Sequence, residues 1–231
     1  VENGLNDIGL TGRDIDAILI THEHVDHIAG LGVLSRRYGI PIYTTEKTAD
    51  AIQETKSVGK IPEELFHPIC AEEAFTIKDL TVNPMRISHD AADPVGYRFS
   101  YGSSHAAVCT DLGTYNDYTV ECLKGMDVLL LEANHDVNML QVGSYPYYLK
   151  QRILGNRGHL SNENSGRLLS RVLHDNLKKV ILGHLSQENN LPELAYETVR
   201  MEIDLADNPY HGGDFPIQVA KRNEVSEMIC F

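Results

Sequence analysis

The densest group of side chains that could do chemistry is the run THEHVDH at residues 21–27. It follows a short β-branched apolar run that is typical of a β-strand, and loops leaving a strand end bring side chains together at a sheet edge. His22 and His24 are two residues apart, so in extended chain they point the same way, whereas Asp26 and His27 lie further round the turn. The pattern predicts a metal-binding loop whose four donors divide between two neighbouring ions.

The elements that must position this loop alternate between strand-like and helix-like patterns. A strand is predicted over 17–20, a helix over 30–38 that is closed by Gly39, a strand over 41–45 and a helix over about 46–53. The beginning of the chain is therefore predicted to repeat a β–α unit.

The middle of the chain has the pattern of an antiparallel meander. Its strands are expected at 74–77, 80–88, 95–101 and 106–110, with hairpin-like turns at 78–79 and 102–104.

Two continuous apolar runs, 127–132 and 179–183, are typical of strands buried on both faces. Ser161 is expected to cap the start of a helix, with Asn164 three residues later. No repeat or linker interrupts these elements. The sequence predicts a single α/β domain over residues 1–231.

The spacing His22-x-His24-x-Asp26-His27 resembles the signature loop of the metallo-β-lactamase superfamily. That resemblance implies an αββα four-layer sandwich, and three further ligands from later strand ends: a His, an Asp and a His. It implies that one ion is held by His22, His24 and His89, the other by Asp26, His27 and His184, and that Asp111 bridges them.

A narrower resemblance, over about residues 14 to 228, is to the YycJ (WalJ)-type branch of this superfamily. That branch implies a metal-dependent nuclease with 5′-to-3′ exonuclease action on DNA, and a link to a cell-wall two-component system. The segments that carry the resemblance are SHDA at 88–91, LEANHD at 131–136, GHLSN at 158–162 and HLSQEN at 184–189.

The start of the chain departs from the superfamily pattern. Only 21 residues precede His22, whereas the superfamily usually has two or more strands before this loop. We therefore expect the N-terminal strands to be missing, with an open sheet edge that lowers stability or is covered by formation of a homo-oligomer.

The implied cofactor is a pair of divalent ions, zinc or manganese, with iron also admissible. Two such ions would share a bridging hydroxide and lower its pKa toward neutrality. Histidine at position 24 favours hydrolysis, since the diiron oxygen-reducing relatives place Glu there. The expected catalytic residues are Asp26, Asp111 and His159, of which His159 contacts phosphate or protonates the leaving group.

Other polar residues at strand ends leave alternatives open. Asn134 and His135 are expected to contact substrate, whereas Glu132 either orients another catalytic group or is a structural hydrogen-bond acceptor.

Residues 137–162 contain no Asp or Glu in a chain of net charge −13. Lys150, Arg152 and Arg157 are expected to bind substrate phosphates, and the nearby tyrosines could stack on bases. The alternative is an amphipathic helix whose tyrosines pack in the core. The tyrosines are Tyr145, Tyr147 and Tyr148.

Composition bounds the function further. The charge of −13 argues against a protein that coats nucleic acid or anionic membrane. The four cysteines contain no CxxC pair, and no apolar run reaches the roughly 18 residues of a spanning helix, so we expect a cytoplasmic protein.

Three functions remain. The first is a dinuclear metal-dependent phosphodiesterase, most simply a nuclease with DNA as its substrate. The second is a small-molecule hydrolase of thioester, lactone or β-lactam type, because one fold serves many reactions. The third, a non-catalytic scaffold, is disfavoured by the seven candidate ligands.

Overall fold

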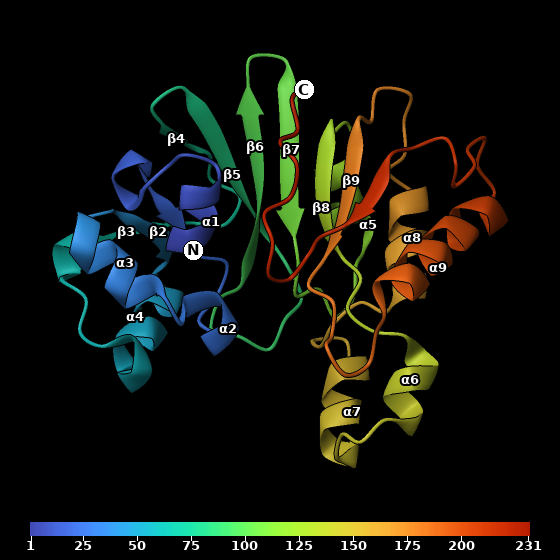
Figure 1. The fold of residues 1–231 in the computed structure, drawn as a ribbon, viewed down its shortest axis with the longest axis horizontal. Coiled ribbons are helices and arrows are strands. Elements are labelled where there is room, and N and C mark those ends of the chain that lie inside the picture. The colour runs from blue at the N-terminus through green and yellow to red at the C-terminus, as the bar shows by residue number, and fades with distance from the viewer. The chain divides into compact units, whose positions relative to one another are not determined.

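A computed structural model describes all of residues 1–231, and the chain forms two compact units. Unit 1 comprises Val1–Arg86, Ala91–Val95 and Lys221–Glu227, and unit 2 comprises Ile87–Asp90, Gly96–Ala220 and Met228–Phe231. Figure 1 shows the elements of both. The single domain over residues 1–231 stays a prediction.

Unit 1 contains a parallel sheet of β1 (Ile18–Leu19), β2 (Ile42–Thr45) and β3 (Phe66–Ile69). Between β1 and β2 runs α3 (Leu31–Tyr38), which ends where Gly39 takes a left-handed conformation with φ of +66°. The buried apolar cluster of unit 1 comprises Ile20, Ile28, Leu31, Ile42, Ile52, Val58 and Ile61.

The rest of unit 1 is short elements and one hairpin. β4 (Phe75–Ile77) pairs antiparallel with β5 (Leu80–Arg86) across a turn in which Lys78 has a φ of +53°. The remaining elements are α1 (Glu2–Asp7), η1 (Gly12–Asp14), α2 (Val25–Ile28), α4 (Glu46–Glu54), η2 (Lys56–Val58) and η3 (Glu63–Leu65).

Unit 2 is built on a twisted sheet. β6 (Val95–Tyr101), which enters from Val95 of unit 1, pairs antiparallel with β7 (Ser104–Cys109). β7, β8 (Val128–Glu132), β9 (Lys179–Gly183) and β10 (Ile217–Val219) then run parallel in that order.

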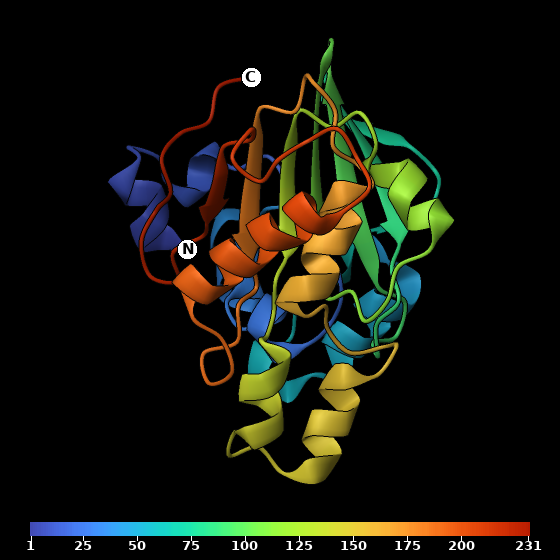
Figure 2. The same cartoon turned by 90° about the vertical axis from the view of Figure 1, so that its right-hand side faces the viewer.

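Helices accompany the sheet of unit 2. α8 (Asn162–Ser170) and α9 (Pro192–Leu205) pack on each other at Gly166, where an added Cβ would lie 2.6 Å from the Cβ of Glu202. Figure 2 shows this pair over one face of the sheet, and a hairpin of two further helices beyond the strand ends. The other helices are α5 (Asp117–Leu123), α6 (Val137–Val142) and α7 (Tyr147–Leu154).

Most predicted elements are confirmed within a few residues, and so is the α/β class. Ser161 caps α8 by accepting a hydrogen bond from the Asn164 N–H, as its sequence position predicts. The expected meander ends at β7, because β8 runs parallel to β7. No helix combines the length and hydrophobicity needed to cross a membrane.

Candidate metal centre

The centre begins at the carboxyl ends of three parallel strands of unit 2. The register aligns Cys109 of β7 with Leu131 of β8, and Glu132 of β8 with Gly183 of β9. Asp111, Glu132 and His184 therefore meet at one edge of the sheet, where parallel strands commonly present functional side chains.

Asp111 lies at the middle of this group and is only 1% exposed. Its Oδ1 is 3.3 Å from Nε2 of His184 and 3.8 Å from Nε2 of His89. The same oxygen is 3.7 Å from Nδ1 of His159. One carboxylate oxygen thus faces two imidazole nitrogens that are able to bind metal.

Glu132 is fully buried, and each of its two carboxylate oxygens accepts two hydrogen bonds. Oε1 accepts from Nδ1 of His159 at 2.8 Å and from Nδ1 of His184 at 3.0 Å. Oε2 accepts from the backbone N–H of Leu112 at 2.8 Å and of Leu160 at 3.0 Å. Only an ionised carboxylate can accept all four bonds, so Glu132 orients the two rings.

The hydrogen bonds also indicate which ring nitrogen of His89 and of His184 faces Asp111. His184 donates its Nδ1–H to Glu132, and His89 donates its Nδ1–H to the Gly158 carbonyl at 3.0 Å. Both rings therefore keep an Nε2 lone pair toward Asp111. Metal-binding histidines usually have such a carboxylate or carbonyl partner behind them.

These residues fit a divalent metal. One polar atom from each of Asp111, Glu132, His159 and His184 lies within 4.8 Å of the others, and Asp111 and His184 are the two of these that we expect to bind the metal. Ligands placed tetrahedrally at about 2.1 Å from zinc lie roughly 3.4 Å apart. The 3.3 Å between His184 Nε2 and Asp111 Oδ1 matches that spacing.

Burial and these hydrogen bonds compete in setting the pKa values. Burial alone would raise the pKa of Glu132, but the hydrogen bonds from His159 and His184 outweigh it and lower the pKa to about 2. For His159, burial lowers the pKa, and the bond to Glu132 outweighs this and raises it. Burial lowers the pKa of His89, opposed by Asp111.

Two of the proposed ligands have left-handed backbone conformations. Asp111 has a φ of 60° and His184 a φ of 57°. Non-glycine residues seldom adopt this region, and those that do cluster at functional sites.

The HxHxDH motif lies in unit 1, where the chain passes from β1 into α2, and its Asp26 and His27 belong to α2. The rings of His22 and His24 are 4.6 Å apart and nearly perpendicular, and those of His22 and His27 are 4.1 Å apart. The Thr21 hydroxyl lies 3.1 Å from Nδ1 of His22 and 3.2 Å from Nδ1 of His27, so it orients both rings.

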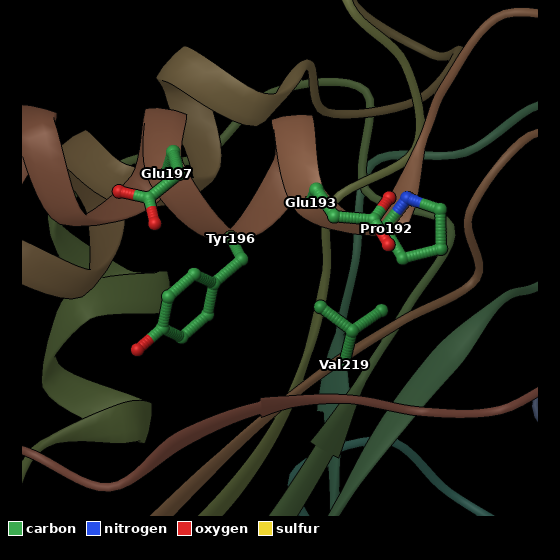
Figure 3. Close-up of a pocket in the computed structure, with 5 residues that line it drawn as sticks. All are labelled: Pro192, Glu193, Tyr196, Glu197 and Val219. Atoms are coloured by element: carbon green, nitrogen blue, oxygen red, sulfur yellow. The ribbon is translucent and has the colours of Figure 1, made fainter.

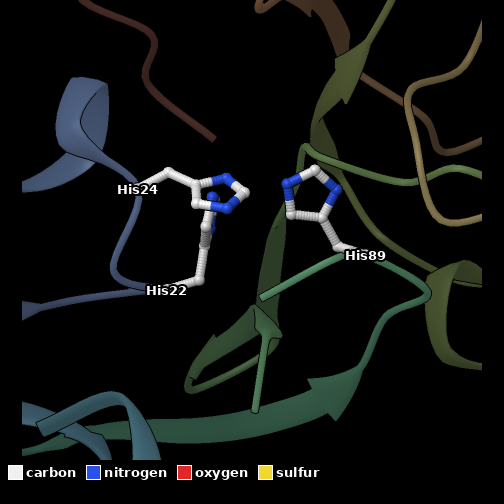
Figure 4. A group of neighbouring side chains, drawn as sticks. All are labelled: His22, His24 and His89. Carbon is white, nitrogen blue, oxygen red and sulfur yellow. The ribbon is translucent and has the colours of Figure 1, made fainter. Parts of the chain in front are cut away.

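Asp26 lies in the single turn of α2, 3.6 Å from Nε2 of its neighbour His27. Figure 4 shows His22 and His24 on this loop of unit 1, and His89 on the segment that follows β5. Each unit thus presents a preformed part of the predicted ligand set.

Asn134 and His135, the predicted substrate contacts after β8, are both buried. The Asn134 amide donates to the His184 carbonyl at 2.9 Å and so supports the ligand loop. His135 is 1% exposed, and burial lowers its pKa to about 4, which keeps it neutral. Contact of either with substrate stays a prediction.

The three predicted phosphate-binding cations each have a partner within unit 2. Lys150 donates to the carbonyls of Gln141 and Gly143 at 2.8 and 2.7 Å, and Arg152 forms an ion pair with Asp90. Arg157 uses only its Nε, which donates to the His89 carbonyl at 3.0 Å, and the residue stays exposed.

A separate hollow of about 250 Å³ lies at α9 and β10. Figure 3 shows the lining side chains Glu193, Tyr196 and Glu197 on α9, together with Val219 of β10. No histidine and none of the predicted site residues line this hollow.

The structure thus brings the predicted ligands of unit 2 together. The sequence did not identify Glu132 as the residue that orients His159 and His184. The available signal was a carboxylate at the end of a continuous apolar strand, just before an Asn-His pair.

Comparisons with known proteins agree with this geometry. Residues 6–184 match the family model of the β-lactamase superfamily domain. The chain is 43% identical over 203 residues to the exodeoxyribonuclease WalJ of Streptococcus pneumoniae, covering 88% of this chain and 76% of the relative. It is 39% identical over 192 residues to the exodeoxyribonuclease YycJ of Bacillus anthracis, covering 83% and 72%.

Among solved structures, the chain is similar to the metallo-β-lactamase fold protein YhfI from Bacillus subtilis. The TM-score is 0.65 at 16% identity, over 94% of this chain and 78% of that one. This likeness bears on the fold alone, and it confirms the predicted metallo-β-lactamase fold.

Proposed function

The chain belongs to the β-lactamase superfamily, in its YycJ (WalJ)-type branch, and is a metal-dependent hydrolase; from this premise we propose that it is a DNA exonuclease working with two divalent ions. The observation that carries the proposal is the buried carboxylate of Asp111 between His89 and His184. The exonuclease names of the two relatives support DNA as the substrate.

The proposed ligand set has seven residues. His22, His24 and His89 would hold one ion, Asp26, His27 and His184 would hold the other, and Asp111 would serve both. The division follows the superfamily pattern. It is supported by the orientation of His89 and His184, whose Nε2 atoms both face Asp111 Oδ1.

Two divalent ions, when bound, supply a water of lowered pKa and stabilise the attacking and leaving oxygens of a phosphodiester. Zinc and manganese both suit a set of imidazoles and carboxylates. Asp26 and Asp111 offset part of the positive charge and accept hydrogen bonds at the reacting centre.

We assign His159 the protonation of the leaving oxygen. Its Nδ1–H is held by Glu132, which leaves Nε2 as the nitrogen for substrate. The hydrogen bond to Glu132 raises the pKa of His159 despite its burial, which favours the protonated ring as a proton donor through Nε2. A departing 3′ oxygen of DNA needs such a proton, because it leaves as an alkoxide.

Of the predicted cations, Arg157 is the best placed to contact a phosphate. It is exposed, and its Nε binds the carbonyl of the proposed ligand His89, so its remaining N–H groups lie beside the centre. Lys150 binds protein carbonyls and keeps its local positive charge, whereas the charge of Arg152 is offset by Asp90.

The test uses metal-loaded protein and three substrates: duplex DNA with 5′-phosphates, a bis-aryl phosphodiester and a lactoylglutathione-type thioester. We expect turnover of the DNA and of the aryl diester. Turnover of the thioester alone would establish the alternative, a small-molecule hydrolase, and reject the nuclease.

A further inference from the structure

The α6–α7 hairpin of unit 2 has an apolar and aromatic surface that the protein does not cover. Tyr147 and Tyr148 are 77% and 74% exposed, and Val142 is 86% exposed. No residue of α7 is buried, so the helix adds nothing to the core. The structure thereby excludes a core role for these two tyrosines. We call Tyr147 and Tyr148 the tyrosine pair.

The buried side chain of Leu140 in α6 and several polar contacts hold the hairpin in place. Asp136 caps α6 by accepting from the Met139 N–H at 2.7 Å, and Lys150 of α7 donates to two carbonyls at the end of α6. Arg152, one turn after Tyr148, pairs with Asp90. The hairpin is therefore anchored, while the side chains of the tyrosine pair remain exposed to solvent.

The hairpin is continuous with the proposed centre. The chain leaves α7 through Gly155–Gly158 and reaches His159 directly. Ser88 Oγ donates to the Asn156 carbonyl at 2.8 Å, and Arg157 donates to the His89 carbonyl. The carboxyl end of α7 is thus fixed beside His89, and the tyrosine pair is at the other end, about 12 Å along the helix for eight residues.

Charge indicates what kind of molecule this surface fits. The whole chain carries −13, yet residues 137–162 contain no Asp or Glu and include Lys150, Arg152 and Arg157. Asp90 offsets the charge of Arg152, so the positive charge that a polyanion meets at this segment comes from Lys150 and Arg157, whereas the average surface repels it. Exposed aromatic rings next to positive charge are the usual surface for single-stranded nucleic acid.

We propose that the tyrosine pair stacks on unpaired bases of the DNA strand that is being cut. Because the tyrosine pair is at the end of α7 remote from His159, the stacked bases are nucleotides away from the cleaved bond, not those that flank it. The proposal rests on the nuclease function above, and it adds a requirement for substrate length.

The experiment compares Tyr147→Ala/Tyr148→Ala with wild type on a 12-nucleotide single strand, a dinucleotide and the bis-aryl phosphodiester. We expect the double variant to bind the 12-mer about 10-fold or more weakly, with an unchanged kcat/KM on the two short substrates. Tyr147→Phe/Tyr148→Phe keeps the rings and should bind as wild type does. The matched control is Tyr101→Ala, which removes a tyrosine that is 60% exposed on β6.

The outcomes separate this proposal from the function on which it rests. If wild type degrades DNA and the double alanine variant binds the 12-mer unchanged, the tyrosine pair is not the stacking surface. Equal losses on the 12-mer and the aryl diester also overturn it, because the defect is then in the centre. If wild type forms a dimer and the double alanine variant does not, the surface binds a second copy of the chain and the stacking proposal is overturned. Failure of wild type to bind any oligonucleotide overturns both proposals.

Discussion

Asp111 and Glu132 are both buried carboxylates, yet their surroundings give them different tasks. Glu132 accepts four hydrogen bonds and has no oxygen left for a metal. Asp111 instead presents Oδ1 to the Nε2 atoms of His89 and His184. We therefore treat Asp111 as a ligand and Glu132 as the residue that positions His159 and His184.

Glu132→Gln tests the positioning role. An amide in this place puts its NH₂ group against either two ring N–H donors or two backbone N–H donors, so a buried donor loses its partner at a cost of about 1–3 kcal/mol. We expect metal affinity to fall roughly 10- to 100-fold, as when other partners of metal-binding histidines are removed. Chelator-competition titration with zinc measures it.

The control for this variant is Glu188→Gln, which changes an exposed carboxylate of the same unit. An unchanged zinc affinity in Glu132→Gln would show that the rings are oriented without Glu132.

At this scale the sequence predicted candidate ligands but not the partners of Glu132. His22, His24, Asp26 and His27 are close along the chain, so their spacing alone indicated a metal site. The four donors to Glu132 are 20, 27, 28 and 52 residues away from it. Only the strand register brings them together.

In unit 2, Asp127 lies directly before β8 and helps to hold the strand register that brings these residues together. Its Oδ2 accepts from the His105 N–H at 2.8 Å, and its Oδ1 lies 3.4 Å from Nζ of Lys178. Burial would raise the pKa of Asp127, but these two partners outweigh it and lower the pKa below the ordinary value of 3.8.

Asp127→Asn should therefore have a pH-dependent effect on stability. Because the folded pKa is the lower one, the carboxylate stabilises the fold above pH 3.8, and this contribution is lost as pH falls further. We expect a loss of about 1 kcal/mol at pH 7 that shrinks below about pH 4. Urea unfolding at pH 7, 5 and 3 checks this, and an equal loss at all three would contradict it.

The connection from α7 to His159 depends on Gly158. A Cβ there would lie 2.1 Å from the Ile153 carbonyl oxygen and 2.3 Å from that of Arg152, and both are backbone atoms. We expect Gly158→Ala to cost about 1–3 kcal/mol of stability and to lower activity by displacing His159. Thermal unfolding and DNA digestion measure the two effects.

Gly30→Ala is the matched control, because a Cβ at Gly30 meets no atom within 4 Å. A Gly158→Ala protein as stable and active as this control would show that the connection tolerates a side chain.

Element prediction succeeded where the pattern is local. The apolar runs became β8 and β9, and Gly39 ended α3 as expected. The pattern of residues 137–162 could not decide between packed and exposed tyrosines, because burial depends on which elements pack against α7. In the structure none of its residues is buried.

At the scale of the whole molecule, the charge of −13 and the proposed DNA substrate are compatible. The net charge opposes non-specific coating of DNA, while the proposed ions and the acid-free segment 137–162 concentrate positive charge at one place. Composition reports only the sum of charges, so it could not predict this distribution.

The most direct test of the account is the release of nucleotides from 5′-phosphorylated duplex DNA by metal-stripped protein reloaded with zinc or manganese, beside Asp111→Asn. Asparagine tolerates the left-handed backbone at this position but removes the charge facing His89 and His184. We predict release that requires metal, and in Asp111→Asn fewer bound ions and a rate at least about 100-fold lower. DNA left intact with every metal, or full activity in Asp111→Asn, would contradict the account.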